Sequence, residues 1–187
     1  SGNLEPNALT ISLWVMFNDL DYVNGQGRLH GLAGKGYPDA IAPNSGWWFS
    51  YDNRNNRKSF SYTAFGNVKG GYAGGGNNFG GSVYEYPFQN GVWYQLAISV
   101  TPTEARLYVN GVQVGPVKPL IDTNFIDSSR NLSIGSLNKN FQSLSGKIDD
   151  VRIYNRVLVS KEISSIYTGI PLPSIYISSI EDFQTVS

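Results

Sequence analysis

Apolar residues recur at every second position along most of the chain, a spacing that predicts β-strands. In residues 9–17 (LTISLWVMF), every alternate residue from Leu9 to Phe17 is apolar. Trp14 and Met16, which belong to the other face, are apolar as well. We therefore expect this strand to be covered on both sides.

The same alternation predicts further strands, in residues 46–52, 57–65, 93–101, 104–114, 130–137 and 146–154. The segment 104–114 contains Asn110-Gly111, and both of these residue types accept the positive φ that a tight hairpin turn requires. We expect two antiparallel strands to be joined at this turn.

One short segment has the spacing of a helix. Ile163, Ile166 and Tyr167 fall on one helical face, Ser160 is of a type that caps the start of helices, and Gly169 is of a type that ends them. Short strands between turns, without alternating helices, indicate an all-β chain. The pattern predicts a two-sheet antiparallel jelly-roll sandwich with one short C-terminal helix.

Composition limits the classes of partner. The length of 187 residues suits a single domain, which we expect to span residues 1–187. Fourteen basic and fourteen acidic residues give a formal net charge of zero, which disfavours nucleic acid as a partner. No apolar run approaches the roughly 20 residues of a membrane span, so we expect no membrane insertion. The chain has no cysteine, which excludes thiol chemistry and disulfides.

The chain is weakly charged and rich in turn-forming residues. Charged residues make up 15%, and there are 21 glycines and 12 tyrosines, a profile that favours an extracellular or cell-surface location. The opening residues, SGNLEPNA, lack the charged-then-apolar pattern of a secretion signal. We therefore expect a mature or excised domain.

Two adjacent aspartates open the strand at 146–154. Retaining glycosidases need two carboxylates about 5 Å apart, but neighbouring residues on a strand point to opposite faces. Asp149 is expected to share a face with Val151 and Ile153, and Asp150 to lie with Arg152. The two aspartates therefore do not form a catalytic pair.

The remaining candidates for catalysis have no partner residues in the sequence with which they could form a catalytic site. Glu85, in VYEYP, contributes a single carboxylate. His30 is the one histidine, in a segment (RLHGLAG) with the pattern of an ordinary strand, and the sequence supplies none of the partners that a catalytic triad requires. We expect the protein not to be an enzyme.

A sugar-binding site is expected around Trp48. Sugars stack their apolar C–H faces on aromatic rings and leave their hydroxyl groups to polar side chains. Trp48 shares a strand face with Ser50 and Asp52. An equally weighted alternative is that the Gly-rich loop, residues 66–81, covers Trp48 as a second small core. The candidate ligand-binding residues are Trp48, Asp52, Arg54, Arg57, Tyr72 and Asn78. The other tryptophans, Trp14, Trp47 and Trp93, are expected to be packing residues.

Four segments resemble laminin-G-like domains of the concanavalin A-like lectin/glucanase superfamily. They are LTISLWV, NGVWYQLAISVTPTEARLYVNGVQV, LSIG and GKIDDVRIYNRVLVSKEI, in the family's order. The resemblance spans Leu9 to Tyr167, and the last segment is its most specific part. It implies two antiparallel sheets packed face to face, a role in carbohydrate binding or adhesion, and often a calcium ion.

The resemblance leaves two questions about the strands and the metal. The family has an upstream strand that often supplies a calcium ligand, and the chain starts too late to contain all of it. The extension at residues 170–187, with the alternating SIYISSI, is expected to act as an edge strand in its place. Asp149 and Asp150 either bind calcium, which needs about 6–8 oxygen ligands, or are structural, one accepting backbone N–H groups and the other pairing with an arginine.

We therefore expect a non-catalytic carbohydrate-binding or adhesion module of a larger extracellular protein, whose partner is a polysaccharide or glycan, or a protein surface. The competing class is a structural or assembly module of a surface filament or viral appendage, which a partner strand would complete. A glycoside hydrolase ranks third, and hydrolysis that Glu85→Gln abolishes would support it.

Overall fold

The computed structural model describes residues 8–20, 28–37, 45–54, 58–65, 82–101, 103–119, 131–136 and 142–172. The candidate ligand residues Arg57, Tyr72 and Asn78 lie outside these ranges, as does SIYISSI of the C-terminal extension. Within the described ranges, no helix is both long enough and apolar enough to span a bilayer.

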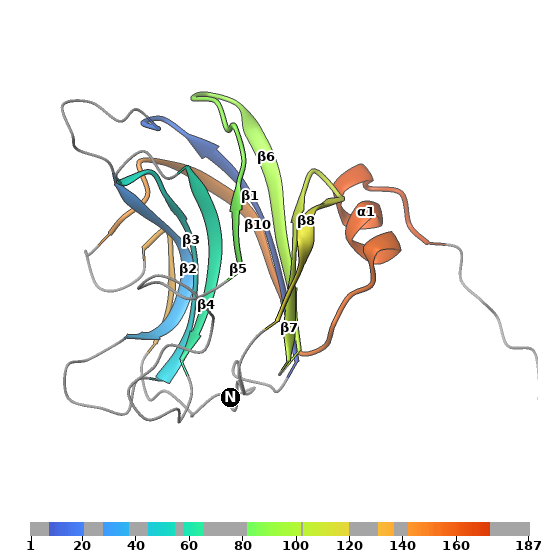
Figure 1. The fold of residues 1–187 in the computed structure, drawn as a ribbon. Helices are drawn as coiled ribbons and strands as arrows, with labels where there is room; N and C mark the ends of the chain where they lie inside the picture. Colours follow the sequence, from blue (N-terminus) through green and yellow to red (C-terminus); the bar gives the residue numbers. More distant parts are fainter. Residues whose placement is uncertain are drawn as a thin grey trace, which may run out of the picture.

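Two antiparallel five-stranded sheets face each other (Figure 1). In spatial order, the first sheet contains β10 (Gly146–Tyr154), β1 (Leu9–Phe17), β6 (Trp93–Val100), β7 (Glu104–Val109) and β8 (Val112–Pro119). The second contains β5 (Ser82–Glu85), β4 (Ser59–Phe65), β3 (Ser45–Asp52), β2 (Leu29–Tyr37) and β9 (Leu132–Ile134). This arrangement confirms the predicted sandwich.

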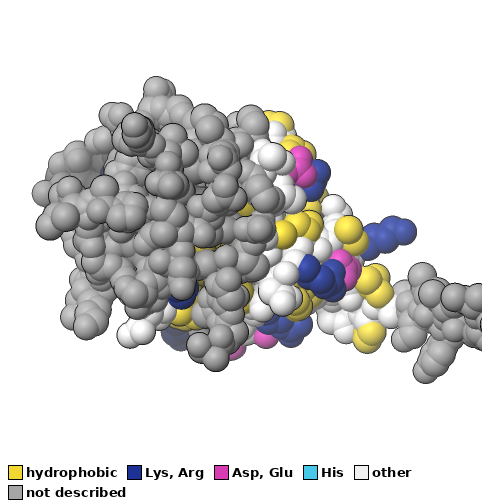
Figure 2. Space-filling view, turned by 90° about the horizontal axis from the view of Figure 1, so that it is seen from below, with side chains coloured by type: hydrophobic (Ala, Val, Ile, Leu, Met, Phe, Trp, Pro, Cys, Tyr) yellow, Lys and Arg dark blue, Asp and Glu magenta, His cyan; other side chains and the backbone are white. Residues whose placement is uncertain are grey.

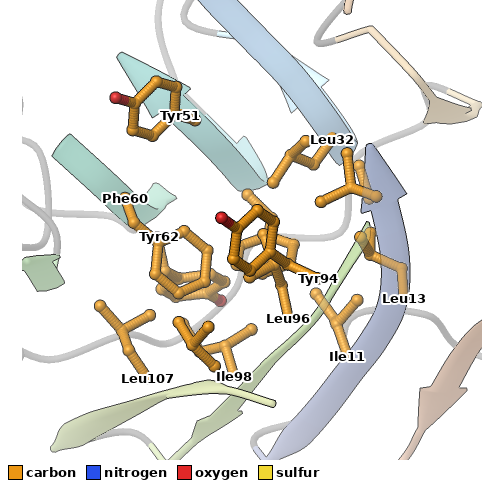
Figure 3. Packing of buried hydrophobic residues seen from close by; sticks show 14 of the residues in the cluster. Ile11, Leu13, Leu32, Tyr51, Phe60, Tyr62, Tyr94, Leu96, Ile98 and Leu107 are labelled. Atoms are coloured by element: carbon orange, nitrogen blue, oxygen red, sulfur yellow. The ribbon is translucent and has the colours of Figure 1, made fainter. Parts of the chain in front are cut away.

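The core lies between the two sheets. Ile11 and Leu13 of β1 meet Leu96 and Ile98 of β6 on the inner face of the first sheet, and all four are fully buried (Figure 3). The second sheet contributes a layer of large rings, which includes Trp47, Phe49, Tyr51, Phe60 and Tyr62. The alternation read from the sequence therefore assigned the inner faces of these strands correctly.

The hairpin between β7 and β8 turns at the predicted residues. Asn110 has φ 51° and Gly111 has φ 77°, the positive values that this turn requires. The Asn110 side chain also accepts a hydrogen bond from the backbone N–H of Gln95, at 2.9 Å. The turn is thereby attached to β6.

Helix α1 (Ser160–Thr168) packs on the outer face of the first sheet (Figure 1). Ile163 of the helix, with Leu158 before it, is buried against Ala97 and Tyr108. The helix is followed by Gly169 as its C-cap, with φ 70°, as predicted. Its start differs from the prediction, since Ser160 is the first helical residue and Val159 holds the cap position.

Hydrogen bonds from β1 and β6 fix the connection that leads into α1. The Thr10 hydroxyl donates to the Arg156 carbonyl and accepts from the Leu158 N–H, both at 2.8 Å. Ser99 donates to the Leu158 carbonyl at 2.9 Å. This network satisfies polar groups that the helix buries on the outer face of the sheet.

Candidate functional site

The predicted ligand residues of β3 lie on the face of the strand that points away from the core. Trp48, Ser50 and Asp52 share one face of the strand, as expected, while Trp47, Phe49 and Tyr51 join the core. All three outward residues are buried, and Trp48 is only 6% exposed. The ring of Trp48 therefore offers little surface for stacking, and the Gly-rich loop at 66–81, which the alternative expected to cover it, lies outside the described residues. A ligand role for Trp48 stays a prediction.

Asp52 and Arg54 engage each other. The guanidinium donates from Nε to Oδ1 at 2.9 Å and from Nη2 to Oδ2 at 3.0 Å, while the Arg54 backbone N–H also donates to Oδ1 at 2.9 Å. This bidentate ion pair occupies both carboxylate oxygens of Asp52, whose side chain is 8% exposed. A sugar hydroxyl would have to compete with this pair.

Asn53 joins the segments that meet at this end of the second sheet. It is 1% exposed, its Nδ2 donates to the Leu20 carbonyl at 2.8 Å, and its Oδ1 accepts from the Arg28 N–H. Its own backbone N–H donates to the Arg28 carbonyl at 3.0 Å. Sequence analysis did not single out Asn53, because these partners lie in other segments of the chain.

His30 lies in the core rather than in a catalytic cleft. Its ring contacts Phe17 edge-on, with centroids 5.7 Å apart, and Nδ1 accepts the Ser145 N–H at 3.4 Å. Its Nε2 is buried without a hydrogen-bond partner among the described residues. Burial lowers the pKa of His30 from 6.5 to about 4, so the ring is neutral at pH 7.

A β-bulge in β10 changes the predicted faces of the two aspartates. Ser12 pairs with Arg152 but Trp14 pairs with Asp149, so one extra residue is inserted between them, and Asp150 has φ 45°. The prediction that Asp149 shares a face with Val151 was wrong for this reason. Both aspartates are exposed. They remain unsuited to the glycosidase arrangement, since Asp150 is held by an arginine.

The contacts of the aspartates match the structural alternative. Asp149 Oδ1 accepts the Asp150 N–H at 2.7 Å, and Arg152 donates to both oxygens of Asp150 at 2.8 Å. These bonds raise the pKa of the Arg152 guanidinium. Among the described residues, no group of three or more acidic or histidine side chains gathers where a metal could bind. Calcium binding at Asp149 and Asp150 stays a prediction.

The outer face of the first sheet presents a platform that sequence analysis missed. Met16 lies between Lys147 and Trp93 on neighbouring strands, and in the next row Trp14 lies between Asp149 and Gln95. We define the platform as Trp14, Met16, Trp93, Lys147 and Asp149. Trp93 is 39% exposed, so its expected role as a packing residue was wrong.

Helix α1 borders the platform. Tyr167, in its last turn, stacks on Trp14 with ring centroids 5.7 Å apart and an interplanar angle of 28°. The helix stops at Thr168, and Tyr167 keeps 38% of its surface exposed. A signal for this arrangement was present in the sequence, because Trp14, Met16 and Trp93 are apolar on the faces opposite the core.

Comparisons with known proteins agree with this architecture. A laminin-G family model, described as the concanavalin A-like lectin/glucanases superfamily, matches residues 1–164. The receptor binding domain of botulinum neurotoxin C/D mosaic serotype is similar with a TM-score of 0.60 and 17% identity, over 90% of this chain and 37% of that chain. No curated protein matches the chain at a significant level.

Two carbohydrate-active proteins contain a similar fold. Domain 4 of AbnA, a GH43 extracellular arabinanase from Geobacillus stearothermophilus, was solved with arabinotriose. It has a TM-score of 0.52 and 21% identity, over 86% of this chain and 66% of that chain. Trypanosoma rangeli sialidase has a TM-score of 0.50 and 18% identity, over 86% of this chain and 22% of its own length. The present chain thus corresponds to only part of these proteins.

Proposed function

The chain belongs to the concanavalin A-like lectin/glucanase superfamily, and on this premise we propose that it is a non-catalytic module that binds carbohydrate. The module would act within a larger extracellular or cell-surface protein. The residues predicted from the sequence to bind a glycan remain Trp48, Asp52, Arg54, Arg57, Tyr72 and Asn78. The similarity to an arabinanase domain solved with arabinotriose supports a carbohydrate ligand.

The observation that carries the proposal is that five of the seven described carboxylates pair with arginines; Glu85 and Asp149 are the other two. A glycosidase needs one carboxyl group that stays protonated and a second that attacks or activates water. Five carboxylates are instead in ion pairs, with closest N···O distances between 2.6 and 3.3 Å: Asp19–Arg28, Asp52–Arg54, Glu104–Arg106, Asp150–Arg152 and Glu162–Arg156. The hydrogen bond from Arg156 lowers the pKa of Glu162, and a carboxyl group with a lowered pKa is unsuited to act as a general acid.

The charged surface also suits a neutral ligand better than a polyanion. On the face that Figure 2 shows, several basic side chains of the described residues lie beside acidic ones, and the visible charges do not gather in a large patch of one sign. Sugar recognition relies on aromatic stacking and hydrogen bonds, which need no net charge.

A glycan array, run in parallel with calcium and with EDTA, tests the proposal. We expect binding to at least one neutral glycan, with a Kd of about 10⁻⁵ to 10⁻³ M per site. Loss of the signal in EDTA, and in Asp149→Asn with calcium present, would support a calcium site at β10. Absence of binding in both buffers would contradict the proposed function.

A second candidate function is that of an assembly module, which exposed apolar residues support. Val112 in β8 and Ile170 after α1 are 67% and 68% exposed. In an assembly, a partner subunit would cover these two apolar residues, which would explain their exposure in the single chain. Concentration-dependent oligomerisation in sedimentation velocity, together with an empty glycan array, would favour this function over carbohydrate binding.

A further inference from the structure

We propose that the platform on the outer face of the first sheet is a stacking site for neutral oligosaccharides, separate from the site predicted around β3. The inference rests on the proposed function, because it assumes that the module binds sugar. It adds a second binding surface, on the sheet opposite to the one that carries Trp48, Asp52 and Arg54.

The pairing of three strands positions the platform residues. In β1 and β6, Trp14, Met16 and Trp93 occupy outward positions, because their sequence neighbours Val15 and Tyr94 face the core. Met16 lies directly opposite Trp93. The aromatic surface is therefore held by backbone pairing rather than by a loop, which lowers the cost of ordering it on binding.

The helix covers only part of the platform: Trp14 and Met16 are half-buried, whereas Trp93, Lys147 and Asp149 are exposed. Ile163 covers the outer face over Ala97 and Tyr108, and Tyr167 reaches Trp14, but the helix ends at the next residue. Substituting Gly111 would push against Tyr167 and the backbone of Ser164, so the hairpin fixes the position of the last helical turn. The platform, which we also call the ledge, is therefore bordered on one side by the ring of Tyr167.

The chemistry of the ledge fits a sugar. The indole of Trp93 and the ring of Tyr167 offer surfaces for the C–H face of a pyranose or furanose ring. Lys147 and Asp149, both exposed, stand on the far side of β1 and supply an ammonium donor and a carboxylate acceptor for hydroxyl groups. An aromatic floor with a donor and an acceptor at its edge is the usual composition of a small polar ligand site.

The size of the ledge distinguishes a sugar from a protein partner. Three neighbouring strands and two rows of residues span a floor of about 10 Å by 7 Å. This matches one or two sugar rings, whereas a stable protein interface buries roughly 800 Å² on each partner. The ledge alone is thus too small to hold a second copy of the chain.

Tryptophan fluorescence and calorimetry with four trisaccharides, namely arabinotriose, xylotriose, cellotriose and laminaritriose, test the inference. At least one should change the fluorescence of the wild-type chain, and Trp93→Phe should reduce this change while it still binds in calorimetry. Trp93→Ala and Tyr167→Ala should each weaken binding about tenfold or more. Val117→Ala, at a site of 38% exposure on β8, serves as the matched control and should bind like the wild type. Circular dichroism of each variant checks that the sandwich is intact.

Two results separate failure of this inference from failure of the proposed function. If Trp93→Ala and Tyr167→Ala bind like the wild type while Tyr72→Ala does not, the ledge is not a site and the module still binds sugar elsewhere. If the wild-type chain binds none of the four trisaccharides at concentrations up to about 10 mM, both the ledge and the proposed function are contradicted.

Discussion

Lowering the pH from 7 to 4 is expected to destabilise the folded chain by about 3 kcal/mol through His30 alone. Burial is the main cause that lowers the pKa of His30 from 6.5 to about 4, and the positive charge of Arg28 lowers it as well. The negative charges of Asp19 and Asp52 act in the opposite direction and raise the pKa. Because the unfolded chain binds a proton more readily in this range, stability is fully present above pH 6.5. It is lost as the pH falls towards 4.

Urea unfolding at pH 7 and pH 4 measures this effect. Carboxylates also titrate near pH 4, so the relevant quantity is the difference between the wild type and His30→Gln, which carries no titrating group at this position. We expect the pH-dependent loss of unfolding free energy to be smaller in the variant by about 3 kcal/mol. An equal loss in both proteins would show that His30 is not held neutral by its surroundings.

Asn53→Ala is expected to destabilise the chain by about 2–4 kcal/mol. The substitution leaves the Leu20 carbonyl and the Arg28 N–H without the side-chain partners that Asn53 supplies at a 1% exposed position. Each buried polar group left unpaired costs about 1–3 kcal/mol. The damage should centre on the end of the second sheet that carries Asp52 and Arg54.

Chemical unfolding of Asn53→Ala and of a matched variant checks this prediction. Asn90→Ala removes a hydrogen bond to the same residue, the one from the Leu20 N–H to Asn90 Oδ1 at 2.8 Å, but at an exposed position. We expect it to cost less than about 1 kcal/mol. Equal effects of the two substitutions would mean that burial of Asn53 does not determine its contribution.

The fold could be predicted because its signals are local. Alternation in 9–17 and 93–100 assigns the inner residues of β1 and β6, and Asn110-Gly111 identifies the hairpin by residue type alone. Gly169 marks the end of α1 in the same way.

The candidate sites were less predictable because they depend on pairing between distant strands. The bulge at Asp150 appears only when β10 is aligned with β1, and alternation by itself gave Asp149 the wrong face. Trp93 was expected to pack because tryptophan is usually buried. Its exposure follows from where α1 ends, a feature that the pattern of β6 does not contain.

The proposed function requires that this domain bind carbohydrate without cleaving it. Incubating the chain with immobilised arabinan, xylan and cellulose, and measuring both retention and released reducing ends, tests this claim most directly. We predict that at least one polysaccharide retains the chain and that none releases reducing ends above the level of a no-protein control. Release that Glu85→Gln abolishes, or the absence of retention on every polysaccharide, would contradict the account.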